Sequence, residues 1–374
     1  MGGIIVNILV TGANGFVGKN LIATLEQNEN YTIFPVTRQT TQEQLTASAK
    51  EADFIFHLAG VNRPVEEAEF QEGNVGFTQT LLETLVNVGS KAPILVTSSI
   101  QAENTSAYGQ SKKAGEELVF EYGVKQSVTT YIYRLPNLFG KWSKPNYNTV
   151  IATFSHKIAR GEAITVNDPT VELNLVYIDD LVAEFLRALE GQPTIEGKFC
   201  MVPVSYQETL GYIVELLQNF KASRGNRLIG NLKDDFTRKL YSTYLNFLPE
   251  NDFSYPLLTH SDHRGSFTEF VKSPYAGQVS VNVSKPGITK GEHWHHTKNE
   301  KFLVVSGQGV ICFRDYFSDK VIEYPVSGES LEVVDIPTGY THSIVNTGES
   351  DMVTIMWVNE LFDPKHPDTF YLEV

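Results

Sequence analysis

The sequence predicts two domains, a doubly wound α/β domain over residues 1–248 followed by an all-β barrel over residues 249–374. Three observations support this prediction. The 374 residues exceed the roughly 100–200 residues of one ordinary domain. Near the amino terminus an apolar run, a glycine-rich turn and an amphipathic stretch follow one another, as in parallel α/β folds. From about Pro249 onward, short runs of Val, Ile, Phe and Thr alternate with turns, and no long helical period remains.

The composition limits the class of protein. The net charge of −14 gives no indication of a nucleic-acid or acidic-membrane partner, and we expect neither. Only two cysteines are present, Cys200 and Cys312, and their separation argues against a disulfide framework and for a reducing compartment. The first apolar run is too short to cross a bilayer, and no basic segment precedes it. We therefore expect a cytoplasmic protein.

The apolar run Ile4–Val10 predicts a strand, and the amphipathic stretch that ends near Gln27 predicts a helix. The turn between them, TGANGFVG, contains three glycines. They permit a tight turn and let a pyrophosphate approach backbone N–H groups at the helix N-terminus. We therefore expect a dinucleotide cofactor here, contacted by Gly12, Asn14, Gly15, Phe16, Val17 and Gly18.

The end of the second predicted strand, Tyr31–Thr37, indicates which dinucleotide is bound. An NAD site normally has a carboxylate about 20 residues past the glycines, where it hydrogen-bonds the ribose. Thr37 and Arg38 stand there instead. A guanidinium binds a 2′-phosphate well, so we predict NADPH. The alternative is that Arg38 is a solvated loop cation.

A third apolar strand, Asp53–Leu58, runs into Ala59 and Gly60. Small residues at the end of a strand let the backbone pass close to a cofactor. We therefore expect Leu58, Ala59 and Gly60 beside the dinucleotide.

Tyr108 and Lys112 lie four residues apart on a predicted helix, and positions four apart share one face of a helix. A cationic amine near a phenol stabilises the phenolate, so we expect a lowered pKa for Tyr108, in the range useful for proton transfer. The preceding strand, Ile94–Val96, leads into Ser98 and Ser99, either of which could orient a substrate oxygen.

The amino-terminal part resembles the extended short-chain dehydrogenase/reductases, a Rossmann-type family, over residues 4–240. It contains, in that family's order, TGANGFVG, HLAG, SS, YGQSK, RLPNLFG and VYIDDL. The resemblance implies a reductase in which Tyr108 donates a proton, while Lys112 activates it and contacts the nicotinamide ribose. It implies Ser99 as the third catalytic residue, with Ser98 as the alternative, and Leu135 as a cofactor contact.

A polar loop, Gly140–Asn148, lies where such enzymes hold a nucleotide sugar. Its lysines could meet a diphosphate or could equally be surface charges. Asp179 and Asp180 stand at the start of a predicted helix, and we expect them to be caps rather than catalysts. We expect substrate contacts from Asn137, Lys141 and Lys144.

A histidine cluster dominates the carboxy-terminal part, in the segment GITKGEHWHHTKNEKFLVVSG. Residues two apart on a strand share a face, so His293 and His295 can point at one ion, and Glu300 returns on the next strand. Further on, DIPTGYTHSIVN brings His342 after a turn. Three imidazoles and a carboxylate suit zinc or another divalent first-row metal. The alternative is that these histidines solvate a strand face.

The spacing of both segments resembles the paired motifs of the cupin superfamily, small double-sheet barrels that hold a metal inside. One departure is visible: Leu331 stands where a glycine usually opens the second motif, and Gly328 lies three positions earlier. The segment SDHRGSFTEFV resembles the entry segment of cupins that epimerise nucleotide-linked ketohexoses. That resemblance implies a phosphate or carboxylate contact for Arg264, and the alternative is an ordinary hairpin turn.

A reductase joined to a metal site suggests two successive steps on one sugar ketone. A metal on the ketone oxygen makes the neighbouring C–H acidic, so epimerisation must precede reduction. The base that removes the proton stays open among His295, His296, Lys298 and a metal-bound hydroxide.

The whole chain resembles the bifunctional enzymes of capsular polysaccharide biosynthesis, in segments such as NLFGKWSKPNYN and VTIMWVNE. The resemblance implies a homodimer whose cupin epimerises C3 of a UDP-2-acetamido-2,6-dideoxy-hexos-4-ulose. Its reductase would reduce C4 with NADPH to the 6-deoxy-talose sugar, on the route to UDP-N-acetyl-L-fucosamine. Two other interpretations are an NADPH or ligand sensor, which would be expected to lack Tyr108 or Lys112, and a reductase beside an iron-dependent dioxygenase.

Overall fold

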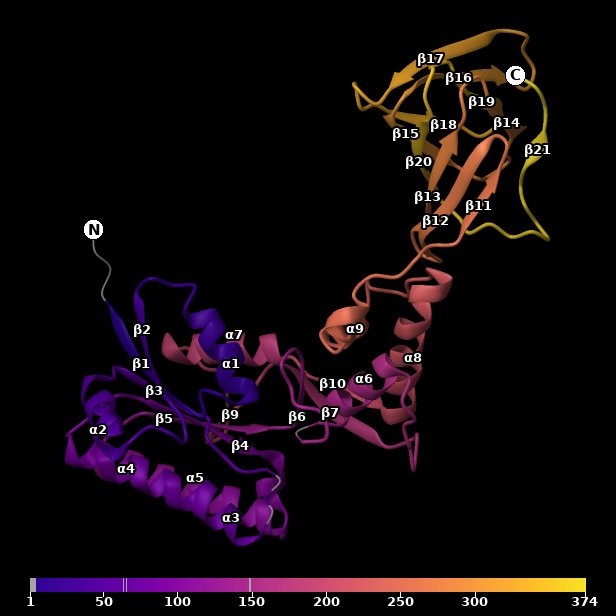
Figure 1. The fold of residues 1–374 in the computed structure, drawn as a ribbon. Coiled ribbons are helices and arrows are strands. Elements are labelled where there is room, and N and C mark those ends of the chain that lie inside the picture. Colours follow the sequence, from indigo (N-terminus) through magenta and orange to yellow (C-terminus); the bar gives the residue numbers. More distant parts are fainter. Residues whose placement is uncertain (1–4, 63, 65, 148) are drawn as a thin grey trace. The chain divides into compact units, whose positions relative to one another are not determined.

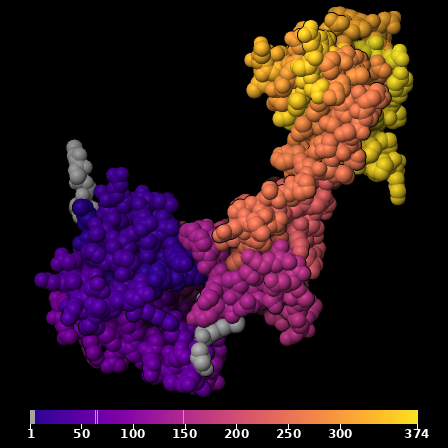
Figure 2. All heavy atoms as spheres, viewed as in Figure 1, coloured from indigo at the N-terminus to yellow at the C-terminus, as the bar shows by residue number. Residues whose placement is uncertain are grey.

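The computed structural model describes residues 5–62, 64, 66–147 and 149–374 (Figure 1). Ile4, where the first predicted strand begins, and Asn148, where the predicted polar loop ends, lie outside these ranges. The chain forms two compact units, and side chains fill the spaces between the ribbons of each (Figure 2). Met1–Leu217 and Lys239–Pro249 make the first unit; Gln218–Arg238 and Glu250–Val374 make the second. None of the helices in the described ranges is both long and apolar enough to cross a bilayer.

A seven-stranded sheet forms the centre of the first unit, in the order β2-β1-β3-β4-β5-β9-β8. Along this order each neighbouring pair as far as β9 is parallel, and the edge strand β8 is antiparallel to β9. The central strands are nearly continuous apolar runs because helices bury both faces of the sheet. The strand bounds are Val6–Thr11 (β1), Tyr31–Val36 (β2), Phe54–His57 (β3), Ile94–Ser99 (β4), Thr130–Leu135 (β5), Ile195–Glu196 (β8) and Phe199–Cys200 (β9).

Helices pack on the two faces of this sheet, as Figure 1 shows. α1 (Phe16–Leu25) and α7 (Ile178–Leu189) bury their apolar sides against one face. The other face is covered by α2 (Gln42–Glu51), α4 (Phe77–Asn87) and α5 (Ala107–Gln126). A short helix, α3 (Ala68–Phe70), continues as a π-helical turn, Gln71–Gly76, and a 3₁₀ turn, Ile100–Glu103, follows β4. This arrangement confirms the predicted doubly wound α/β fold.

The first unit also contains a smaller sheet of three strands, β6 (Asn137–Phe139), β7 (Glu172–Tyr177) and β10 (Tyr206–Thr209). β6 is parallel to β7, and β10 is antiparallel to it. The remaining helical segments are α6 (Val150–Arg160), α8 (Leu210–Asn226), α9 (Asp235–Leu245) and a 3₁₀ turn (Glu250–Asp252).

The carboxy-terminal part of the second unit, from β11 onward, forms two antiparallel sheets, which confirms the all-β class predicted for this part of the chain. One has the order β11-β12-β13-β20-β15-β18 and the other β17-β16-β19-β14-β21, so the described strands form two ladders rather than one closed barrel. A core that includes Phe302, Ile311, Phe313, Ile344 and Met352 draws on both sheets. The bounds are Thr259–Asp262 (β11), Gly265–Ser273 (β12), Gly277–Ser284 (β13), Thr289–Trp294 (β14), Glu300–Ser306 (β15), Gln308–Asp315 (β16), Val321–Ser327 (β17), Val333–Ile336 (β18), Tyr340–Asn346 (β19), Met352–Val358 (β20) and Phe370–Tyr371 (β21).

Candidate active site and metal centre

The glycine turn between β1 and α1 packs closely against the loop that follows β3. Gly12 has φ +68°, and a Cβ there would lie 2.7 Å from the amide nitrogen of Ala59. A Cβ on Gly18 would lie 2.3 Å from the carbonyl oxygen of Gly12. Gly15 is the N-cap of α1, and no side chain caps this helix, which leaves its first N–H groups free to meet an anion. The predicted cofactor contacts therefore share one turn: Gly12, an exposed Asn14, Gly15, Phe16, Val17 and Gly18.

The loop after β3 lies between this turn and α5, which carries Tyr108 and Lys112. Thr11 Oγ1 accepts hydrogen bonds from the amides of Leu58 (3.1 Å) and Ala59 (3.2 Å). A Cβ on Gly60 would lie 3.0 Å from the Nζ of Lys112. The three predicted contacts of this loop thus lie beside both the glycine turn and the lysine.

Tyr108 and Lys112 lie in the first part of α5, which Ser106 caps by accepting a hydrogen bond from the Gly109 amide. The Tyr108 hydroxyl donates to Oδ1 of Asn62 at 3.1 Å. It also contacts the Ser99 hydroxyl at the end of β4. Lys112 Nζ donates to the carbonyl oxygen of Thr97 at 3.2 Å.

The pKa of Tyr108 differs from the sequence-based expectation. Burial raises it above its ordinary value of 10.0, and the hydrogen bond from Ser99 offsets only part of that rise. Burial also lowers the pKa of Lys112 to about 8, against the opposing charge of Glu116. The ammonium is 6.0 Å from the centroid of the phenol ring. The expectation of a lowered Tyr108 pKa was wrong for this structure, because the sequence does not show how deeply the phenol is buried.

Ser98 and Ser99 occupy different environments. Ser98 Oγ donates to Oε1 of Glu116 at 2.5 Å, and Arg134 donates two more hydrogen bonds to the same carboxylate (2.9 and 2.7 Å). Ser99 instead reaches Tyr108 and accepts a hydrogen bond from the Gln101 amide. The structure therefore brings Ser99, and not Ser98, to the phenol.

Asn74 contributes to this site without having received a role from the sequence. Its side chain binds the backbone of Val61 in both directions (2.7 and 3.1 Å) and donates to Ser111 Oγ at 3.0 Å. Ser111 in turn donates to the carbonyl oxygen of Tyr108. The π-helical turn that carries Asn74 has no signature in the sequence that could have predicted this connection.

The remaining predicted contacts of the first unit are more scattered. Arg38 is exposed in the loop after β2, and Leu135 is buried at the end of β5. Asn137 is exposed at the start of β6 and donates to the Asn174 carbonyl oxygen at 3.4 Å. Lys144 lies 5.2 Å from the ring centroid of Tyr147.

Lys141 forms an ion pair with Asp179 in the first turn of α7. Asp180 accepts two hydrogen bonds from Lys239, at 3.0 and 2.8 Å. The N-cap of α7 is Tyr177, and no side chain caps it. The two carboxylates therefore lie in the favourable first turn of a helix, as a structural role requires, but they bind lysines rather than cap backbone N–H groups.

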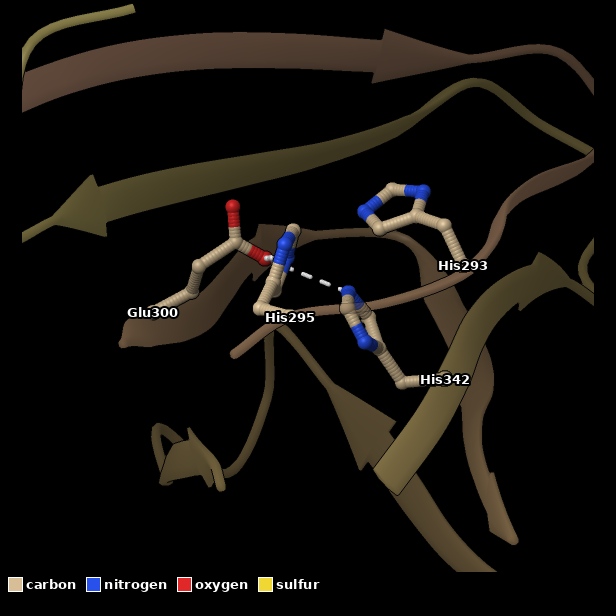
Figure 3. Close-up of side chains that lie close together, drawn as sticks. All are labelled: His293, His295, Glu300 and His342. Carbon is tan, nitrogen blue, oxygen red and sulfur yellow. Dashed lines mark ion pairs between the residues drawn. The ribbon is translucent and has the colours of Figure 1, made fainter. Parts of the chain in front are cut away.

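The four predicted metal ligands converge inside the second unit (Figure 3). His293 lies on β14, directly opposite His342 on β19, while His295 and Glu300 flank the loop between β14 and β15. One ligand atom from each residue lies within 4.8 Å of those of the others. A β-bulge between Gly291 and His293 shifts the register of β14 and turns the histidine inward.

The donor set fits a divalent metal ion. Oε2 of Glu300 lies 3.2 Å from Nε2 of His342 and 3.6 Å from Nε2 of His295. These three buried atoms make no well-formed hydrogen bond within the protein, an unusual state for buried polar groups. An ion with tetrahedral geometry would satisfy all of them together with His293.

The electrostatics of the group also favour a cation. Burial, together with the neighbouring His342 and His295, lowers the pKa of His293 to about 4, so its imidazole is neutral near pH 7. Burial alone would raise the pKa of Glu300, but contacts with His295 and His342 outweigh it and hold the pKa well below its ordinary value. A carboxylate beside the neutral imidazole of His293 is a pair of donors that suits a metal ion.

The structure also shows the contacts of Arg264, Lys298 and Gly328, three other residues of this unit that the sequence analysis names. Arg264 lies in the hairpin turn between β11 and β12 and donates to Oδ2 of Asp262 from Nε (3.0 Å) and Nη2 (2.7 Å). Lys298 is buried and donates to the carbonyl oxygen of Pro367 at 2.6 Å, so its ammonium serves a structural contact. A Cβ on Gly328, three residues before Leu331, would lie 2.6 Å from Ser306 Cα, so this position has no room for a side chain.

Comparison with known proteins places this architecture in a family. Residues 8–198 match the NAD dependent epimerase/dehydratase family, and residues 260–370 match the polysaccharide biosynthesis C-terminal domain. The chain belongs to the NAD dependent epimerase/dehydratase family, in a group that joins this domain to a polysaccharide biosynthesis C-terminal domain.

More particularly, the chain is 44% identical to UDP-2-acetamido-2,6-beta-L-arabino-hexul-4-ose reductase of Pseudomonas aeruginosa, over 98% of both chains. It is also 60% identical to the capsular polysaccharide assembling protein CapF of Staphylococcus aureus. That match covers 98% of this chain and 100% of the crystal structure, with a TM-score of 0.92. UDP-glucuronic acid 4-epimerase of Bacillus cereus shares the fold at 19% identity over 64% of this chain and 98% of its own, with a TM-score of 0.55. The expected resemblance to a two-domain enzyme of capsular polysaccharide synthesis is confirmed.

Proposed function

We propose that the chain is a bifunctional nucleotide-sugar enzyme. Its β unit epimerises C3 of a UDP-2-acetamido-2,6-dideoxy-hexos-4-ulose, and its α/β unit then reduces C4 with NADPH. The product is UDP-2-acetamido-2,6-dideoxy-L-talose, on the route to UDP-N-acetyl-L-fucosamine. One observation carries the proposal: a tyrosine, lysine and serine group and a His₃Glu group each converge within a single chain whose full-length relatives act in this chemistry.

The reduction is assigned to the first unit. NADPH, when bound, supplies the hydride that reaches C4 of the ketone. Tyr108 supplies the proton to the oxygen formed there, since its raised pKa keeps the phenol protonated at neutral pH. Ser99, which contacts the same phenol, orients the substrate oxygen, and the ammonium of Lys112 beside Gly60 binds the nicotinamide ribose.

Arg38 is the residue that favours NADPH over NAD. It is exposed at the end of β2, and the position holds no carboxylate for a ribose hydroxyl. A 2′-phosphate would receive paired hydrogen bonds from the guanidinium. Asn137, Lys141 and Lys144 are proposed as contacts of the UDP-sugar.

The epimerisation is assigned to the second unit. His293, His295, Glu300 and His342 would hold a zinc or similar divalent ion, which when bound would polarise the C4 ketone oxygen and make the C3 hydrogen more acidic. Lys298 is already bonded to Pro367 and Thr369, which makes it an unsuitable base for that hydrogen. Arg264 is proposed to contact the phosphate of the nucleotide.

We further propose that the enzyme is a cytoplasmic homodimer. On the outer face of the six-stranded sheet, Val281, Ile355, Leu303 and Val333 stand side by side across four strands. Val333 is 59% exposed and Ile355 36%. A second copy of the same face would bury this apolar row, and a change of Ile355 to Arg would then yield a monomer by light scattering.

The direct test is solvent deuterium exchange into a UDP-4-keto-6-deoxy-HexNAc, followed by NMR first without NADPH and then with it. The proposal expects deuterium at C3 without NADPH, and reduction of the same sugar after NADPH is added. If C3 acquires no deuterium with zinc supplied, the β unit is not an epimerase.

A further inference from the structure

Asp368 touches the metal group from 73 residues farther along the chain. Its backbone carbonyl oxygen lies 2.6 Å from Nδ1 of His295. Since a carbonyl can only accept, Nδ1 carries the hydrogen, so in the neutral tautomer that this contact selects, Nε2 is the nitrogen with the lone pair. That Nε2 is the buried atom that faces Glu300.

The carboxylate of Asp368 binds the loop that links two of the ligands. Oδ1 accepts from the His296 amide at 3.0 Å. Oδ2 accepts from the amides of Thr297 (2.8 Å) and Lys298 (2.9 Å) and from the Thr297 hydroxyl (3.0 Å). Three consecutive N–H groups between His295 and Glu300 therefore point at one side chain.

The residues that follow Asp368 in the chain bind the strands that carry His293 and His342. β21 pairs with β14, with Tyr371 opposite His293. The Leu372 amide donates to the carbonyl oxygen of Glu292 at 3.0 Å, and the Thr341 hydroxyl, next to His342, donates to the carbonyl oxygen of Leu372. Asp368 itself has φ +40°, a costly conformation for a residue other than glycine, which its many hydrogen bonds offset.

We propose that Asp368 is a positioning residue of the metal centre. Its carbonyl oxygen fixes the tautomer and ring orientation of His295, and its carboxylate fixes the loop that sets the distance from His295 to Glu300. Outer-shell partners of this kind typically change metal affinity about 10–100-fold when they are removed. This inference rests on the proposed metal function of the His₃Glu group.

The test uses the full chain, stripped of metal and titrated with Zn²⁺ against a chromophoric chelator. Asp368→Asn places an amide where three N–H donors and one hydroxyl now meet a carboxylate, so zinc affinity should fall about 10–100-fold. Asp363→Asn is the matched control. Asp363 lies five residues earlier, and its carboxylate accepts from the Lys365 amide and contacts His366 rather than the metal-ligand loop, so zinc affinity should stay within about twofold.

A second readout separates positioning from general stability. With Co²⁺ in place of zinc, the visible absorption reports ligand geometry, and Asp368→Asn should change its band positions while Asp363→Asn should not. Lys298→Met cuts the bonds of the same segment to Pro367 and Thr369 but leaves Asp368 intact. It should lower thermal stability of the metal-free protein and leave the cobalt spectrum unchanged.

The outcomes are distinguishable. Zinc affinity of Asp368→Asn equal to wild type, or a loss matched by Lys298→Met with the same spectrum, would overturn the positioning role. If His342→Ala then loses zinc binding while Asp368→Asn does not, the proposed metal function of the His₃Glu group still stands. Failure of the wild-type chain to bind either metal would overturn both.

Discussion

The hydroxyl of Thr11 lies 2.8 Å from Nδ1 of His57, and this contact fixes the imidazole as one neutral tautomer. Thr11 Oγ1 already accepts two backbone hydrogen bonds, so its own hydrogen points to Nδ1. The other ring nitrogen, Nε2, then donates to Thr78 Oγ1 at 2.8 Å, and Thr78 donates to the Asn74 carbonyl oxygen at 2.7 Å. A chain of hydrogen bonds thus joins the glycine turn to the π-helical turn beside α5.

His57 should make the first unit sensitive to acid. Burial, assisted by the charge of Lys112, lowers its pKa to about 3, whereas the unfolded value is 6.5. The unfolded chain therefore binds the proton first, and the stability that this residue supplies is complete above pH 6.5 and is lost as pH falls toward 3. Replacement by Gln should flatten that pH dependence, measured as hydrogen exchange of the β1 and β3 amides. His263→Gln, in an exposed turn, should leave it unchanged.

Reduction should slow as pH rises above about 8. The lowered pKa of Lys112 means that its cation is lost in that range, while the phenol of Tyr108 stays protonated. Stability changes in the opposite direction. Because the folded pKa lies below the ordinary 10.5, the cost of the buried charge is complete below pH 8 and is relieved as pH rises toward 10.5. Single-turnover oxidation of NADPH against pH measures the rate, and Lys112→Arg should remove the alkaline decline from whatever activity remains. A rate that stays flat to pH 10 would contradict this assignment.

Tyr108→Phe should separate the two reactions. The phenol is the proposed proton donor of the reductase, and loss of such a donor typically lowers rate about 10²–10⁴-fold. Deuterium exchange at C3 should be unchanged, since the four proposed metal ligands lie in the other unit. Tyr212→Phe, at a partly exposed position on α8, serves as the control for both assays. Simultaneous loss of both activities in Tyr108→Phe would refute the division of labour.

His295→Ala should remove the metal and lower the thermal stability of the second unit. The side chain is buried and supplies one of four ligand atoms, whereas its exposed neighbour His296 supplies none. His296→Ala should therefore retain wild-type metal content by elemental analysis. A metal content of His295→Ala equal to that of the wild type would show that these four residues do not hold the ion.

Gly18→Ala should weaken NADPH binding. The added Cβ would lie 2.3 Å from the Gly12 carbonyl oxygen, so the turn must move away from α1, at a cost of about 1–3 kcal/mol. Gly230→Ala adds a methyl group where no atom lies within 4 Å, so it is the matched control. Fluorescence titration with NADPH measures both, and equal affinity of the two variants would show that the turn tolerates the shift.

Three of the four residues proposed as metal ligands have a local signal in the sequence. His293 and His295 lie two residues apart, and the returning strand carries Glu300 a few residues later, so one strand, its loop and the next strand bring the three close together. Asp368 could not be predicted in the same way. Its contact to His295 uses a backbone carbonyl, which every residue has, and the two lie 73 residues apart.

Burial and register explain what else the sequence did not show. The pKa of Tyr108 depends on how much of the phenol is buried, and the choice between Ser98 and Ser99 depends on Glu116 reaching back from α5. The bulge at Gly291 and the π-helical turn at Asn74 are likewise local irregularities that period-based patterns do not report.

The chain passes between its two compact units at three places, after Leu217, after Arg238 and after Pro249. The boundary predicted between residues 248 and 249 lies one residue from the last of these. A fragment that starts at residue 249 would therefore lack residues 218–238 of its own unit, while the shortened reductase would carry them as an unpaired remnant. Because the first two of these places lie inside α8 and α9, no division of the chain that follows the two units leaves both helices whole.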